Sequence, residues 1–139
     1  MRGVKPNLSG EGGDGTITEA PEPPDWIGES AAEEWRRVVP DMIARRRLNE
    51  GDLGPLASYC LAMGEVRDMQ KKISVEGAVT YDDKGRPRKH PAVGIRDAAM
   101  TQARLLANEL GLTPVSRQRP GIRGGQQGGG GDLFAGMDY

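Results

Sequence analysis

The chain has 139 residues, and its 19 lysines and arginines nearly balance 20 aspartates and glutamates, giving a net charge of −1. This balance argues against a protein evenly coated with positive charge for nucleic acid. The single cysteine, Cys60, excludes an internal disulfide and a cysteine-based zinc site. No apolar run approaches the roughly 18 residues that a membrane-spanning helix needs, so we expect a cytosolic protein without membrane contact.

Composition divides the chain into three parts. Glycine and proline concentrate at the two ends, which predicts a disordered arm at 1–25, a helical domain at 26–119, and a glycine-rich linker with a terminal peptide at 120–139. Arg2 and Lys5 in the arm suit a narrow DNA minor groove, where extended basic segments bind. The alternative for the arm is an ordinary solvated tail.

A first helix is expected soon after Trp26. Ser30, followed three residues later by Glu33, predicts a capping box at its start. Pro40 falls inside the helical pattern and is expected to kink or divide the helix. The helix ends in three consecutive arginines, Arg45, Arg46 and Arg47. They either complement the negative end of the helix dipole or form a patch that contacts phosphates.

A second, long helix is expected from Asp52 to Glu76, with Gly77 as its stop. Two lines of mostly apolar residues recur every seven positions and predict a seam along a neighbouring helix. The first line is Leu56, Met63 and Gln70, and the second is Tyr59, Val66 and Ile73. Residues 78–89 then form a small hairpin. Four cations gather at its tip, at Lys84, Arg86, Arg88 and Lys89, and indicate either a nucleic-acid contact or a solvated loop.

A third helix is expected from His90 to Pro114, with Pro91 in its first turn and Gly111 just past its end. One apolar side would pack on the core; it consists of Ala92, Ile95, Ala99, Leu106 and Leu110. A second line of Val93, Met100 and Ala107, spaced by seven, would be left for another subunit. The alternative is a helix that is buried within one small domain.

The terminal peptide DLFAGMDY differs from the glycine-rich linker before it. Four apolar side chains, those of Leu133, Phe134, Met137 and Tyr139, alternate with two aspartates. An acidic and apolar end on a glycine tether is typical of a docking peptide, although an inert tail is the alternative.

Nothing in the sequence indicates catalysis. The only histidine, His90, precedes a proline at a helix start, where a capping role fits better than a general base. Cys60 falls on the apolar side of the second helix and is expected in the core. No phosphate-binding loop, metal-ligand spacing or paired acid and base is present. We therefore expect a binding or assembly protein with no catalytic residues, no cofactor and no metal.

Four stretches together resemble one branch of the small subunit of phage terminases, the enzymes that package viral DNA. They are RGVKP at 2–6, PEPPDWIGESAAEEWRRVVPDM at 21–42, LASYCLA at 56–62 and HPAVGIRDAAMTQARLLANELGLTPVSR at 90–117. The last is similar to that branch's pattern of a proline-started helix ending in L-G-L-T-P-x-x-R. The resemblance covers about residues 1–119.

The resemblance implies a mainly α protein that assembles into a homo-oligomeric ring of roughly eight to twelve subunits. Such a subunit binds double-stranded viral DNA at the packaging-initiation site and recruits and regulates the large ATPase-nuclease subunit, in the cytoplasm of the infected bacterial host. On this reading 26–119 is the oligomerisation and DNA-recognition domain, with two long packed helices joined by the hairpin. The arm, the three arginines and the hairpin are candidate DNA contacts. The terminal peptide is the candidate contact for the large subunit.

Two other functional classes fit parts of the pattern. A dimeric helical transcriptional regulator would need a short recognition helix after a sharp turn, and the break at 49–52 is its clearest location. A structural adaptor that binds only protein is the third interpretation.

Overall fold

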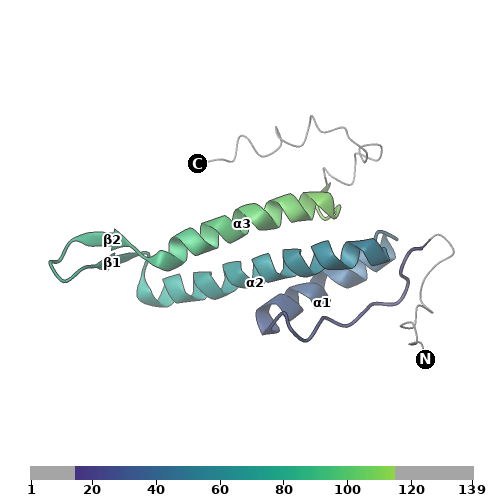
Figure 1. Ribbon diagram of the computed structural model, residues 1–139, viewed down its shortest axis with the longest axis horizontal. Coiled ribbons are helices and arrows are strands. Elements are labelled where there is room, and N and C mark those ends of the chain that lie inside the picture. The colour runs from purple at the N-terminus through teal and green to yellow at the C-terminus, as the bar shows by residue number, and fades with distance from the viewer. Residues whose placement is uncertain (1–14, 115–139) are drawn as a thin grey trace, which may run out of the picture.

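Three helices and one hairpin are the main elements of the described residues. The computed structural model describes residues 15–114. The order is α1 (Glu29–Ala44), a 3-10 turn η1 (Glu50–Asp52), α2 (Leu53–Glu76), β1 (Val79–Tyr81), β2 (Pro87–Lys89) and α3 (Pro91–Glu109). The helices lie side by side, and the hairpin projects from one end (Figure 1). The mainly helical fold with a small antiparallel hairpin is as the sequence predicts.

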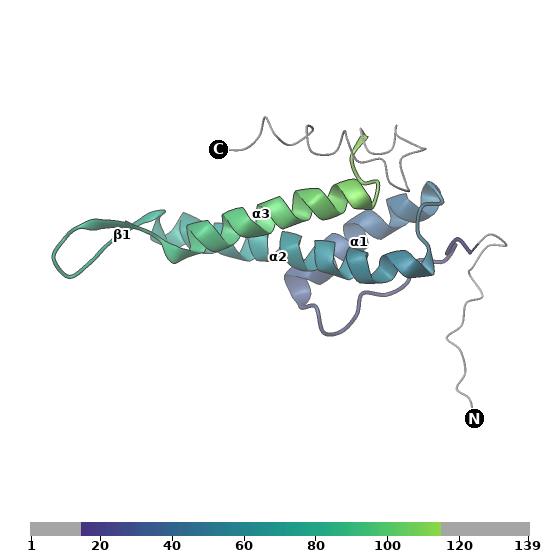
Figure 2. The ribbon, with the colours of Figure 1, turned by 45° about the horizontal axis from the view of Figure 1, so that its top comes forward.

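The middle helix is α2, which packs against both α1 and α3. The two flank α2 in Figure 1, and α1 overlaps α2 in the view of Figure 2. The seam predicted along α2 contacts both neighbours. The side chain of Arg96 on α3 donates to Gln70 Oε1 at 2.9 Å, whereas Tyr59 Oη donates to Glu34 of α1 at 2.6 Å. On the opposite flank, Ser30 of α1 donates to Asp68 at 2.6 Å. Because the chain reverses between consecutive helices, neighbouring helices are antiparallel.

The core occupies only one half of this elongated molecule. Met42, Leu48, Leu56 and Cys60 are at most 1% exposed, and Ala103 and Leu110 of α3 join their cluster. The first turn of α1 lies against Gly64, so α1 covers only the first half of α2. Beyond that point α2 and α3 continue as a pair that we call the stalk, residues 69–97. Ile73, His90 and Ala92 are its only buried residues.

The segment before α1 is more ordered than the sequence indicates. Ile17 donates its backbone N–H to the Leu48 carbonyl at 2.7 Å, and Trp35 Nε1 donates to the Pro21 carbonyl at 2.8 Å. Residues 15–27 thus run along α1 (Figure 1). A buried indole N–H needs an acceptor, and this segment supplies it; residues 1–14 of the predicted arm lie outside the described residues.

The capping box predicted for α1 is wrong, and so is a division of the helix at Pro40; a kink there, the other outcome expected at Pro40, stays a prediction. The helix begins after Gly28, which has φ 86° and no side-chain cap, and Ser30 bonds to Asp68 of α2 instead of forming the capping box. Pro40 does not divide the helix, which continues to Ala44. Proline removes a single hydrogen bond, and the flanking Val39 and Met42 are both 1% exposed, so core packing outweighs that loss.

The ends of the other helices follow their sequence signals. Gly77, with φ 90°, ends α2, and Gly111, with φ 74°, follows α3. His90 caps α3, because its Nδ1 accepts the Ala92 N–H at 2.9 Å. Among the helices of 15–114, none has the length and apolar character that crossing a bilayer would require.

Candidate nucleic-acid and assembly surfaces

The hairpin holds its cations in a fixed arrangement. Val79 pairs with Lys89, Thr80 with Arg88 and Tyr81 with Pro87. The turn closes by a bond from the Gly85 N–H to the Asp82 carbonyl at 2.9 Å. The Asp82 carboxylate also accepts the backbone N–H of Lys84 at 2.9 Å. A turn of this kind favours aspartate at its start and glycine where φ is positive, and Gly85 has φ 78°.

Asp82 also organises the two arginines of the hairpin. Its carboxylate lies 2.9 Å from Arg86 Nε and 3.5 Å from an Arg88 Nη. Hydrogen bonds from the backbone of Arg86 and Lys84, and then from the two arginine side chains, lower the pKa of Asp82. By contrast, within 15–114 no acidic side chain pairs with Lys84 or Lys89. The hairpin therefore presents two unpaired lysines beside two positioned arginines.

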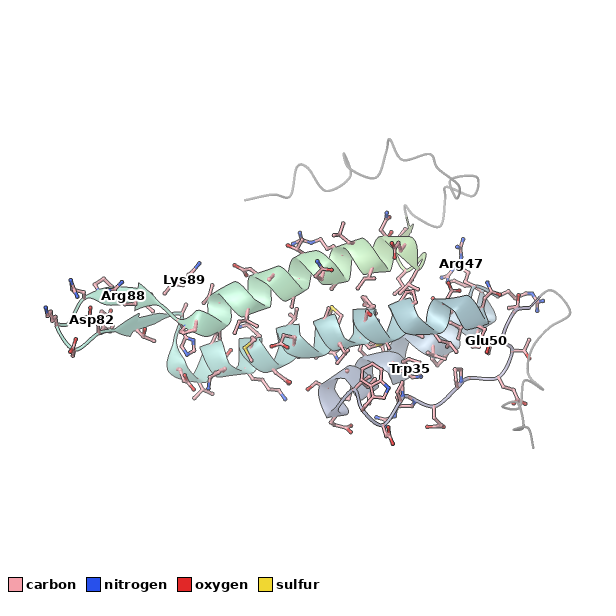
Figure 3. The ribbon with its side chains drawn as sticks, in the orientation of Figure 1. Trp35, Arg47, Glu50, Asp82, Arg88 and Lys89 are labelled. Carbon is pink, nitrogen blue, oxygen red and sulfur yellow. The ribbon has the colours of Figure 1, made fainter. Side chains whose placement is uncertain are left out.

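The candidate basic residues do not form one surface. The hairpin cations lie at one end of the molecule and the arginines at 45–47 lie near the other (Figure 3). The 24 residues of α2, about 36 Å of helix, separate these ends. Arg45 is bonded to Asp41 of its own helix at 2.9 Å, and Arg47 lies over Gly111, where an added Cβ would be 2.8 Å from its Nη1. Arg2 and Lys5 lie outside the described residues.

The base of the hairpin is tied to the stalk through His90. Because Nδ1 of this imidazole accepts a backbone N–H, its Nε2 carries the proton and donates to Glu76 at 2.7 Å. That bond, followed by one from Lys72, lowers the pKa of Glu76. The last turn of α2 and the first turn of α3 are thereby joined at the point from which the hairpin projects.

The outward face of α3 differs from the predicted one. Of the proposed interface line, Ala107 packs against the core, Val93 is half-buried and Met100 is 37% exposed. Ile95, placed on the core side by the sequence, is 47% exposed, and Leu105 is 49% exposed. Alanines occupy the face toward α2, since Ala92 and Ala103 are both buried.

The exposed residues of α3 form a regular seam. Its members are Ile95, Ala98, Gln102 and Leu105, all exposed. Their spacing of three, four and three residues is the spacing of helices that pack as a coiled coil. We call these four residues the seam. The spacing of these four residues is present in the sequence. The sequence analysis instead chose the second line, with Val93 and Met100, which lies on a different side of the helix.

A buried charged group that the sequence analysis missed fixes α1 to α2. Glu34 has an exposure of 0%. It accepts from Arg37 and from Arg67, each at a shortest distance of 2.6 Å, and from Tyr59 Oη at 2.6 Å. Burial alone would raise the pKa of Glu34, but the bonds from Arg37 and Tyr59 and the charges of both arginines outweigh it and lower that pKa. The network makes the pairing of α1 with α2 specific.

Reactive side chains have structural roles in the part of the chain that the structure describes. Cys60 is fully buried, and burial raises the pKa of its thiol to about 12, so the thiolate needed for nucleophilic attack is suppressed. His90 is a helix cap. No group of three or more potential ligands within 15–114 could hold a metal ion. The candidate docking residues Leu133, Phe134, Met137 and Tyr139 lie outside the described residues.

Comparison with known proteins gives one match. A family model described as phage terminase, small subunit, matches residues 31–127, which is more than half of the chain and includes α1, α2, the hairpin and α3. No curated protein and no solved structure matches.

Proposed function

The chain belongs to the phage terminase small-subunit family, and from this premise we propose that it recognises viral DNA at the packaging-initiation site and recruits the large subunit. Its role is in phage DNA packaging, in a family whose small subunits are generally not catalytic. The proposed site of action is the cytoplasm of the infected bacterial host. The main support for DNA binding is the basic hairpin at the end of the stalk, which is the proposed DNA contact.

The shape and charge of the hairpin support contact with duplex DNA. A two-stranded ribbon has dimensions that the major groove accepts. Lys84 and Lys89 can bind phosphates without first breaking an ion pair, whereas Arg86 can reach DNA while Asp82 restricts its orientation. A guanidinium has five donors, so a bond to Asp82 leaves others for DNA. The hairpin end, rather than the end with Arg45–47, is the proposed contact.

The fold argues against the regulator alternative. The helix after the break at 49–52 is α2, which is 24 residues long and has α1 and α3 on two sides. A recognition helix needs a free face to enter the major groove. The helix after the break is thus the central helix of the fold, and it is far longer than the short recognition helix that the regulator would need.

Assembly into a homo-oligomeric ring is the second part of the proposal. The stalk buries few residues within one protomer, and the seam of Ile95, Ala98, Gln102 and Leu105 is free to accept a helix of a second copy. A ring of roughly eight to twelve copies would repeat the hairpin around one rim. Individually weak phosphate contacts would then act together, because each bound hairpin raises the effective concentration of the next.

Recruitment of the large subunit is assigned to the terminal peptide at 132–139. Its aspartates and apolar side chains suit docking on a complementary surface. Deletion of Asp132–Tyr139 is expected to abolish stimulation of the large subunit's ATPase while DNA binding is retained. Full stimulation by the shortened chain would remove the peptide from this role.

The function as a whole is tested by binding of the full chain to two duplexes of equal length. One carries the packaging-initiation region of the phage and the other is a shuffled duplex of the same composition. Specific recognition predicts tighter binding to the first duplex by at least about a thousandfold at physiological salt. Equal affinity for both duplexes would contradict site recognition, and absence of binding to either at low salt would contradict DNA binding itself.

A further inference from the structure

An apolar groove at the base of the hairpin has no occupant among the described residues. Ala78, Val79, Pro87 and Val93 line it, and Arg88 and Lys89 complete its rim. It is a shallow depression of about 380 Å³ that is open to solvent over most of its extent, a shape that suits an extended peptide lying across it better than an enclosed small molecule. Phosphate contacts alone would leave these apolar side chains in water, so DNA does not account for this groove.

The chemistry of the groove matches one segment of the same chain. Residues 132–139, DLFAGMDY, combine apolar side chains with two aspartates and no lysine or arginine. Leu133 and Phe134 suit an apolar floor, because removing large apolar side chains from water is favourable. Asp132 and Asp138 suit a rim that carries Arg88 and Lys89, whose guanidinium and ammonium groups complement carboxylates.

The length of the chain allows this contact. The described part ends at Pro114, beyond the end of α3 that lies away from the hairpin (Figure 1). The groove is about 28 Å back along the helix, from its 19 residues at about 1.5 Å each. The residues from Pro114 to Leu133 span at most roughly 60 Å when extended. The segment therefore reaches the groove of its own protomer.

We propose that residues 132–139 dock in the groove between the hairpin and the start of α3 of the same chain. The docked segment covers the rim cations and places its aspartates beside the lysines proposed to bind DNA. The docked segment thus competes with DNA for the hairpin. The large subunit, which is proposed to bind the same segment, would draw it out of the groove. This regulatory consequence rests on the proposed function, whereas the docking itself does not.

Photo-crosslinking tests the docking without using DNA. The full chain carrying Gly131→Cys is labelled at the new cysteine with benzophenone-maleimide. The native Cys60 does not react with the maleimide, because it is fully buried and burial raises the pKa of its thiol to about 12. Crosslinks are expected within 78–93, in a product with the denatured mass of one chain. Crosslinks mainly at 45–48, or a product of doubled mass, would overturn docking within one protomer.

Two further variants, each made in the Gly131→Cys chain, separate docking from chance contact. Phe134→Ser and Val79→Glu should each reduce crosslinking at 78–93 by about tenfold or more, since a lost apolar contact of this size exceeds one factor of ten in affinity. Leu61→Glu is the matched control, because Leu61 is 38% exposed on α2 and is not part of the groove; its crosslinking should equal that of the parent. Equal yields in all four chains would overturn the proposal.

DNA binding by the same chains tests the consequence. Phe134→Ser should bind duplex DNA several-fold more tightly than the wild-type chain at low salt. Crosslinking with unchanged DNA affinity would retain the docking and refute the competition. If the parent Gly131→Cys chain gave no crosslinks at 78–93 while it bound DNA normally, the docking would be refuted and the proposed function would remain in place.

Discussion

Removing the two unpaired lysines of the hairpin should change how DNA binding depends on salt. The variant is Lys84→Gln/Lys89→Gln in the full chain. Neither side chain has an ion pair within 15–114, and both residues are exposed, so the fold should be unaffected. Circular dichroism and the midpoint of thermal unfolding serve as controls for folding.

The size of the change follows from counterion release. For duplex DNA the logarithm of the affinity falls with the logarithm of salt concentration with a slope of about −0.9 for each phosphate neutralised. Two lost contacts reduce the slope by about 1.8 for each hairpin engaged. Between 50 and 200 mM salt the wild type should therefore lose roughly tenfold more affinity than the variant for each engaged hairpin. The measured difference, divided by 1.8, gives the number of hairpins on the DNA.

The matched control removes two charges from the opposite end. Arg45→Gln/Arg46→Gln makes the same change in net charge, about 36 Å of helix away. Fluorescence anisotropy of a labelled duplex at five or more salt concentrations measures the slopes of all three chains. If the control lowers the slope and the lysine variant does not, the DNA contact lies at the other end and the reasoning is refuted.

The remaining predictions concern stability, measured by urea unfolding. Gly64→Ala should destabilise the protein by about 1–2 kcal/mol, because crowding exceeds the gain in helix propensity: the added Cβ would lie 2.8 Å from the backbone nitrogen of Ala31. Gly94→Ala is the control. A Cβ there meets no atom within 4 Å, so this change should stabilise the protein by up to about 1 kcal/mol. His90→Ala should cost about 1 kcal/mol through loss of the cap and His90→Asn clearly less, and equal costs would refute the capping role. Glu34 has a lowered pKa, so its carboxylate stabilises the fold above the ordinary value of 4.5 and this stabilisation is lost as the pH falls through the lowered pKa. The difference in stability between wild type and Glu34→Gln should thus be greatest near neutral pH and shrink in acid, and a pH-independent difference would contradict the network.

Local signals in the sequence predicted the elements well. Gly77, Pro91 and Gly111 fix helix ends through backbone geometry that few other residues allow, and the hairpin follows from its turn residues. The heptads of α2 predicted its packing against another helix. These signals act over a few residues, so sequence spacing is sufficient to find them.

Properties that depend on tertiary packing could not be found in this way. Ala92 and Leu110 of α3 are buried as the apolar spacing predicts, but Ile95 of the same predicted line is 47% exposed, because α1 does not extend along the stalk to cover it. Glu34 can be buried because distant residues supply partners for its carboxylate, namely Tyr59 and Arg67, which lie 25 and 33 residues later. The spacing of cations could not show that the hairpin and Arg45–47 lie at opposite ends.

The molar mass of the purified full chain in solution tests the central claim most directly, because the proposed DNA contact depends on copies that join through α3. Light scattering should give roughly eight to twelve times the chain mass of 14.9 kDa, and Leu105→Glu in the seam should return the protein to a much smaller species. A wild-type chain that stays a stable monomer at all working concentrations would contradict the account.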